Sequence, residues 1–172
     1  MKKNMMVNIL KHINGNGSDS KYYHNAKKLV EIYREVSWGL QYTLDEMKEA
    51  CADMGYVDVE EALSFMEDGS VDRRSTQALE DRAMSLRLTG VLVRITESAL
   101  AALGDYPHHG EQYFDILNSI YFVKYPLSEN DLLVEMDISR STLYRIKKRA
   151  LSLLGAIIWG YLLPQIMEMQ IA

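Results

Sequence analysis

The sequence predicts an all-α protein, a helical bundle with one long central helix. Apolar residues recur every three or four positions along most of the 172 residues, and no segment alternates between apolar and polar residues as a half-buried strand does. The chain has only three prolines and ten glycines, too few for a protein made mainly of turns and short strands. With 48% hydrophobic residues, it can bury a core of its own.

We expect three parts along the chain. Residues 1–20 should be a flexible N-terminal arm, because a short amphipathic segment is followed by the glycine-, asparagine- and serine-rich stretch 15–20. Residues 21–123 should form the helical bundle and dimerisation region. Residues 124–172 should form a separate C-terminal region that ends in an apolar helix.

The first helix of the bundle is predicted over about residues 22–41. Thr43 and Glu46 have the spacing of a capping box, so a new helix should begin there and end at Gly55. The same device predicts one more short helix, marked by Asp58, Glu61 and Gly69.

The longest periodic run covers residues 75–103 and should end at Gly104. It has two interpretations, the core helix of a monomeric bundle or the seam of a dimer, because a heptad repeat allows a coiled coil without requiring one. The repeat consists of Leu79, Leu86, Val93 and Leu100, and a second stripe consists of Leu88, Leu92, Ile95, Ala99 and Leu103. Residues 111–123 should form a further helix, which Pro126 ends.

Charge is distributed unevenly. The net charge of −5 divides into +5 for residues 1–30, −11 for residues 31–119 and +1 for residues 120–172. Residues 140–149 hold five basic side chains and no acidic one. A short basic segment in an otherwise acidic protein indicates a local anion-binding face.

Residues 127–155 contain that basic segment within a specific helical pattern. Ser128, with Asp131 three positions later, can cap a short helix. Asp137 then stands where the chain must turn sharply, and aspartate tolerates the left-handed backbone that such a turn needs. Ile138 should follow as a buried residue.

Ser139 can cap a second helix, with Thr142 at the matching position. On a helical wheel, one side of this helix is apolar and contains Leu143, Ile146 and Ala150. The opposite side should be exposed and contains Ser141, Arg145 and Lys148, flanked by Tyr144 and Arg149.

Two helices joined by a tight turn, the second displaying cations, form the helix-turn-helix design of DNA-binding proteins. The second helix enters the major groove, where arginine can read guanine and lysine, serine and threonine suit phosphates or single base edges. We therefore expect Arg145 to specify bases, with Lys148 and Arg149 on phosphates. The residues expected at the DNA are Ser128, Ser139, Arg140, Ser141, Thr142, Tyr144, Arg145, Lys147, Lys148 and Arg149.

The segment DISRSTLYRIKKRAL, residues 137–151, resembles the helix-turn-helix of sigma region-4-like domains. With the acidic helical region before it, the chain resembles the ArpU-type transcriptional regulators of phages and prophages of Gram-positive bacteria. The motif match covers about residues 127–154, and the likeness upstream is one of helix layout. The resemblance implies a phage or prophage protein that binds DNA and controls transcription, often of late genes. By matching positions, it places these residues at the DNA: Arg140, Ser141, Thr142, Tyr144, Arg145 and Lys148.

Two other functions stay open, a small terminase-like DNA-packaging protein and an interaction module that binds RNA polymerase. An enzyme is least supported, because no serine–histidine–aspartate or cysteine–histidine set has a supporting context. His109 and Glu111 form a His-x-Glu pair, but no cysteine pair follows, so we expect no metal site and no cofactor.

Residues 150–167 contain no charged side chain. A membrane span needs about 20 mainly apolar residues, and this stretch includes Ser152, Pro164 and Gln165, so a packing or dimerisation helix is the preferred interpretation. The single cysteine, Cys51, fits a reducing compartment. The overall expectation is a cytoplasmic homodimer that binds double-stranded DNA, with RNA polymerase as a further partner and no membrane contact.

Overall fold

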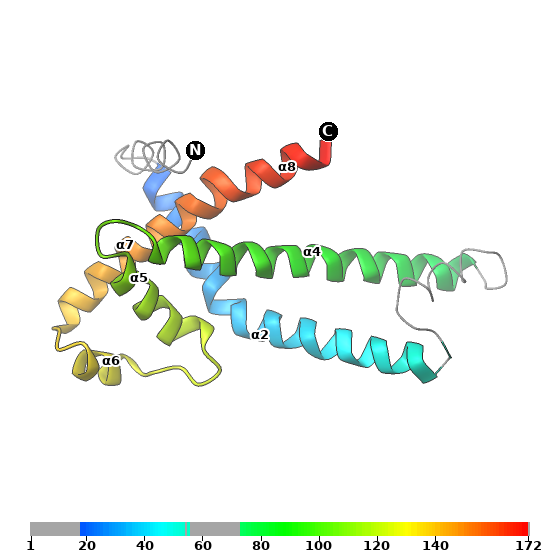
Figure 1. The fold of residues 1–172 in the computed structure, drawn as a ribbon, viewed down its shortest axis with the longest axis horizontal. Coiled ribbons are helices and arrows are strands. Elements are labelled where there is room, and N and C mark those ends of the chain that lie inside the picture. Colours follow the sequence, from blue (N-terminus) through cyan, green and yellow to red (C-terminus); the bar gives the residue numbers. More distant parts are fainter. Residues whose placement is uncertain (1–17, 54, 56–72, 172) are drawn as a thin grey trace. The chain divides into compact units, whose positions relative to one another are not determined.

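The computed structural model describes residues 18–53, 55 and 73–171, and every regular element among them is helical (Figure 1). This confirms the all-α prediction. The elements are α2 (Ser18–Asp53), α4 (Arg73–Gly104), α5 (Gly110–Leu117), the π-helical turn η1 (Asn118–Phe122), α6 (Glu129–Glu135), α7 (Arg140–Ile157), the π-helical turn η2 (Ile158–Leu162) and α8 (Leu163–Ile171). The short amphipathic segment before residue 15 and the helix predicted from Asp58 to Gly69 lie outside the described residues.

The chain forms two compact units. Among the described residues, one contains residues 18–34 and 94–171, and the other contains residues 35–53, 55 and 73–93. The long helices α2 and α4 therefore contribute to both units. Residues 124–171 fold within the first unit, together with α5 and one end of each long helix. Since α2 begins at Ser18, the last residues of the predicted flexible arm are helical.

The helix break predicted at Thr43 is wrong, because α2 runs without interruption from Ser18 to Asp53. The Thr43 hydroxyl donates a hydrogen bond of 2.8 Å to the Gly39 carbonyl oxygen, one turn earlier. A threonine that bonds back in this way stays inside the helix and caps nothing. Gly55, predicted to end this region, has a φ of 85° just beyond the end of the helix.

The predicted long helix is confirmed as α4 and ends at Gly104, as expected. Within the first unit, its C-terminal part is core of a single chain, because five of its residues are buried: Ile95, Thr96, Ala99, Leu100 and Leu103. The same unit uses Tyr33 of α2, whose hydroxyl donates to Glu97 Oε1 at 2.5 Å and whose ring lies 4.4 Å from that of Phe122. In the second unit, Leu88 is exposed.

The C-terminal half of α7 lies at the centre of the first unit, since all nine residues 150–158 are buried. Gly155 allows the closest approach, because a Cβ there would lie 2.4 Å from the carbonyl oxygen of Tyr22 in α2. A helix surrounded on all sides has no place for charged residues. This burial explains why residues 150–158, the first part of the chargeless stretch, carry no charge, and it makes this part a packing helix.

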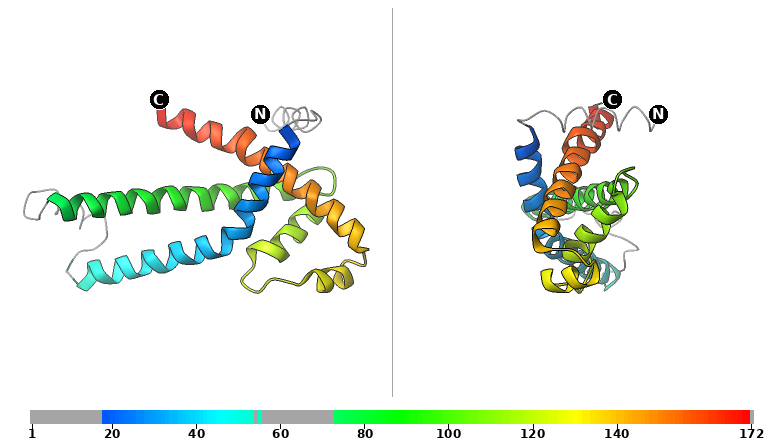
Figure 2. Two further views of the ribbon diagram at one scale, coloured as in Figure 1. Left: turned by 180° about the vertical axis from the view of Figure 1, so that it is seen from behind. Right: turned by 90° about the vertical axis from the view of Figure 1, so that its left-hand side faces the viewer.

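One continuous helical run joins α7, η2 and α8 (Figure 2). Pro164 lacks the N–H that would donate to the carbonyl of Gly160, and its ring crowds that carbonyl. The π-helical turn η2, which contains Gly160, lies at this break in the α-helical hydrogen bonding.

Among the described residues, the run Arg140–Ile166 is the one helix long and apolar enough to cross a membrane by length and composition, and half of its most apolar stretch is buried.

Candidate nucleic-acid interface

The short helix α6 begins with the predicted capping box. The Ser128 hydroxyl accepts a hydrogen bond from the Asp131 backbone N–H at 3.2 Å, and the Asp131 carboxylate accepts one from the Ser128 backbone N–H at 3.3 Å. The Ser128 hydroxyl also donates to Asp131 Oδ2 at 2.6 Å. Ser128, which we expected at the DNA, therefore has its hydroxyl engaged in the cap, next to a carboxylate that repels phosphate.

The turn between α6 and α7 has the predicted left-handed residue. Asp137 has a φ of 51°, a conformation in which most L side chains are strained. The backbone N–H of Ile138 donates to the Leu133 carbonyl oxygen at 3.3 Å, which closes the turn. Ile138 itself is half-buried and packs against the core between the helices.

Replacing Asp137 by valine is expected to lower the free energy of unfolding by about 1–2 kcal/mol, because a β-branched residue is strongly disfavoured at positive φ. The same replacement at the exposed residue Glu135 of α6 should change it by less than about 0.5 kcal/mol. Urea titration of the two variants measures the difference. Equal effects at the two positions would show that the turn tolerates any residue.

Ser139 caps the helix α7 as predicted, because its hydroxyl accepts a hydrogen bond from the Thr142 backbone N–H at 3.2 Å. The Ser139 hydroxyl also lies 3.0 Å from the Ser141 hydroxyl and 2.9 Å from that of Thr142. These three hydroxyls form one polar cluster at the start of the helix, in which Ser139 and Ser141 are exposed and Thr142 is half-buried. Such a cluster can exchange its internal hydrogen bonds for bonds to phosphate oxygens or base edges.

A small apolar core fixes the angle between α5, α6 and α7. Ile116, Leu132 and Leu143, one from each helix, are buried together. Partly buried residues complete the core, namely Ile120, Leu127, Leu133, Met136, Ile138 and Ile146. Because the core holds the inner side of α7, its outer side is presented in a fixed orientation.

The outer side of α7 is the exposed cationic face that the sequence predicts. Ser141, Arg145 and Lys148 are exposed, and Tyr144 beside them is 62% exposed. Arg149 is half-buried at the edge. We call Ser141, Arg145 and Lys148 the α7 cationic face.

Arg140 is exposed at the first position of α7, and its Nη2 donates to Asn130 Oδ1 at 3.1 Å. Asn130 is therefore a further residue of the candidate site, which the sequence does not indicate. It lies ten positions before Arg140 and no motif links the two, so only the folded arrangement of α6 and α7 reveals the contact. The bond orients the guanidinium at the junction between the helices.

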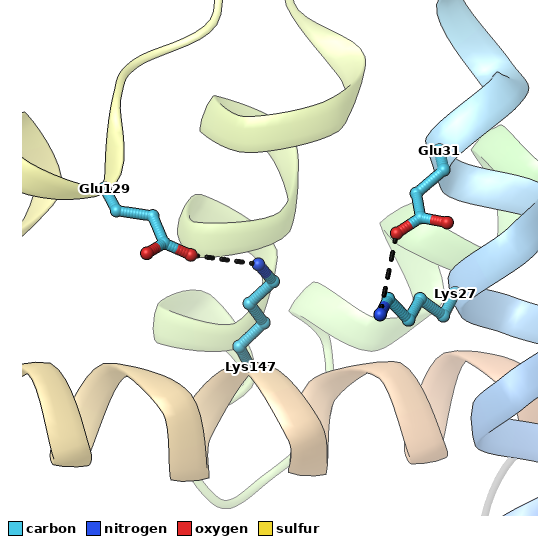
Figure 3. A network of polar contacts seen from close by, with 4 residues as sticks. All are labelled: Lys27, Glu31, Glu129 and Lys147. Atoms are coloured by element: carbon cyan, nitrogen blue, oxygen red, sulfur yellow. Dashed lines mark hydrogen bonds and ion pairs between the residues drawn. The ribbon is translucent and has the colours of Figure 1, made fainter.

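Lys147, which we also expected at the DNA, is not on the exposed face. Its side chain is only 18% exposed, and its Nζ lies 3.4 Å from Glu129 Oε1 (Figure 3) and 5.5 Å from the centre of the Tyr121 ring. Burial by itself lowers the pKa of the Lys147 ammonium, but Tyr121 and Glu129 outweigh it, so the pKa lies above its ordinary value. Lys147 thus connects α7 to α6 and η1.

The ion pair between Lys27 and Glu31, also drawn in Figure 3, lies on the surface and joins two residues of the same helix, α2.

Replacing Lys147 by methionine is expected to lower the free energy of unfolding by about 1 kcal/mol, because the contact with Glu129 is lost while the aliphatic packing remains. The raised pKa means that Lys147 stabilises the fold at neutral pH, and that this contribution is lost as the pH rises above about 10.4. The variant should therefore lose less stability than the wild type between pH 9 and 11. An identical alkaline decline in both proteins, measured by urea titration, would show that this contact contributes nothing.

No metal site is found among the described residues, which hold no group of three or more histidine, cysteine, aspartate or glutamate side chains able to bind an ion. His109, the histidine of the His-x-Glu pair, has a φ of 63° directly before α5. No family model, curated protein or solved structure matches this chain.

Proposed function

We propose that this chain binds double-stranded DNA by inserting the N-terminal half of α7 into the major groove. The main support is that the α7 cationic face is exposed, while the opposite side of α7 is held in place by a buried core. The major groove admits one α-helix, and residues at the N-terminal end of that helix reach the base edges.

Each cation on this surface has a role that suits its position. Arg145, in the middle of the face, can donate two hydrogen bonds to guanine. Lys148 lies one turn further along, where a flexible ammonium suits a phosphate. Arg140, oriented by Asn130 at the start of α7, suits the phosphate backbone beside the groove. Lys147 has no place in this mechanism except to hold α6 against α7.

We further propose that this binding regulates transcription, as a homodimer on two half-sites about one helical turn of DNA apart. Support for the regulatory role comes from the resemblance of residues 127–154 to sigma region-4-like helix-turn-helix modules and of the chain to ArpU-type phage regulators. RNA polymerase is the further partner that this role implies.

The DNA-binding proposal is tested by fluorescence anisotropy with a labelled pool of random-sequence duplexes at several salt concentrations. The two phosphate contacts assigned to Arg140 and Lys148 predict a slope of log affinity against log salt of about −2 per chain. The matched control is the double variant Arg145→Ala, Lys148→Ala, in which the slope should be shallower. Absence of binding by the wild type at the lowest salt concentration would overturn the proposal.

A further inference from the structure

The part of α2 in the second unit carries an exposed aromatic pair. Trp38 and Tyr42 are 69% and 52% exposed, and their rings stack with centroids 5.5 Å apart and planes 15° apart. The other side of this stretch faces α4, where Leu40 lies against Gly90. Large stacked rings that point away from a packed helix pair indicate a contact surface, because tryptophan and tyrosine dominate the energetics of protein interfaces.

Acidic side chains surround this pair. Hydrogen bonding to the Glu46 carboxylate, reinforced by its charge, raises the pKa of the Tyr42 hydroxyl. At 100° per residue, the two rings and all five carboxylates of residues 35–53 fall within about 100° of the helix circumference, and all seven side chains are exposed. We call this set the aromatic–acidic stripe; its members are Glu35, Trp38, Tyr42, Asp45, Glu46, Glu49 and Asp53.

The stripe fits a cationic partner. Its carboxylates repel the phosphates of nucleic acids and of anionic lipids, whereas guanidinium and ammonium groups pair with carboxylates and stack on aromatic faces. The start of α7 in this same chain presents such groups, because Arg140, Arg145 and Lys148 are exposed and residues 140–149 contain no acidic side chain. The exposed ring of Tyr144 adds an aromatic surface beside them.

The spacing of the charges also matches. Glu46 and Glu49 are three residues apart on α2, and Arg145 and Lys148 are three residues apart on α7. Three residues span about 4.5 Å of an α-helix. Two helices lying side by side can therefore form both ion pairs at once.

We propose that the aromatic–acidic stripe of one copy of this chain binds the α7 cationic face of a second copy. Because the same face is the proposed DNA surface, self-association and DNA binding then exclude each other. Only this competition rests on the proposed function, since the contact between copies does not require DNA. The contact differs from the expected two-fold dimer, which leaves both α7 faces free.

Sedimentation velocity with two charge-reversed variants tests the contact. The first variant, Glu46→Lys with Glu49→Lys, makes the stripe basic, and the second, Arg145→Glu with Lys148→Glu, makes the α7 face acidic. The wild type should form a faster-sedimenting species at low salt that is lost at high salt. Each variant alone should lack this species, because its stripe and its α7 face then carry charges of the same sign. An equimolar mixture should regain it, because the basic stripe of the first variant meets the acidic face of the second, and the unaltered stripe of the second meets the unaltered face of the first.

The outcomes separate this inference from the DNA-binding proposal. A variant that keeps the faster species, or a mixture that fails to regain it although both variants have wild-type circular dichroism, overturns the inference. If a reversed variant misfolds, the milder variant Trp38→Ala with Glu46→Gln replaces it and should lose the species. A wild type that stays as one species at all salt concentrations also overturns the inference. The binding partner of the stripe would then be a different, basic protein.

Adding duplex DNA to the wild type should dissociate the faster-sedimenting species. Self-association that persists with DNA bound would contradict the competition, and absence of DNA binding would contradict the proposed function alone.

Discussion

Replacing Gly155 by alanine is expected to lower the free energy of unfolding by about 2 kcal/mol. The new Cβ would lie 2.4 Å from the carbonyl oxygen of Tyr22 and 2.8 Å from its carbonyl carbon, and these backbone atoms cannot rotate away as a side chain would. Overpacking of this kind costs about 3 kcal/mol, and the better helix propensity of alanine recovers about 1 kcal/mol. In a chain of this length, the melting temperature should fall by about 4–8 °C.

Gly160 provides the matched control, because it lies five residues later in the same helical run and a Cβ there would meet nothing within 4 Å. Gly160→Ala should leave the stability unchanged or raise it by up to about 1 kcal/mol. Urea denaturation followed by circular dichroism measures both variants. Similar effects of the two replacements would contradict the close packing of α7 against α2.

The second large effect is expected from Arg145→Ala, which should weaken binding to the preferred DNA sequence by about 1–3 kcal/mol, a loss of roughly 5- to 150-fold. The variant should also lose its preference at one base pair, because the bidentate contact of Arg145 to guanine is the part of the mechanism that reads sequence. The measurement is anisotropy against a panel of duplexes that differ at single positions.

Lys148→Ala is the matched control for this effect. It should weaken binding to all sequences alike and make the salt slope shallower by about one unit, as loss of a phosphate contact does. If Arg145→Ala keeps both the affinity and the preference at every position, Arg145 does not read bases.

Features that depend on neighbouring residues could be predicted from the sequence. The caps at Ser128 and Ser139 involve residues three positions apart, and the left-handed turn at Asp137 follows from the shortness of the connection between two helices. The exposed positions of Arg145 and Lys148 follow from helical periodicity once the apolar side is known. The local geometry of the candidate site was therefore predictable.

Features that depend on contacts between elements could not be predicted in the same way. On the helical wheel, Lys147 lies about 100° from the residue before it and from the residue after it, so periodicity alone does not decide whether its side chain is directed inward or outward. Its inward orientation depends on Glu129, eighteen residues away. The burial of residues 150–158 on all sides depends on α2, which lies more than one hundred residues earlier. At Thr43 the sequence allows both a cap and a back-bonded hydroxyl, and the packing of α2 decides between them.

The central claim, that α7 reads DNA, is tested most directly by selecting bound duplexes from a random-sequence library and sequencing them. If α7 reads DNA, the bound duplexes should be enriched in a short motif containing guanine, and in a two-fold repeat of this motif if the dimer binds two half-sites. Selected duplexes with the same sequences as the starting library, or no retained DNA at low salt, would contradict it.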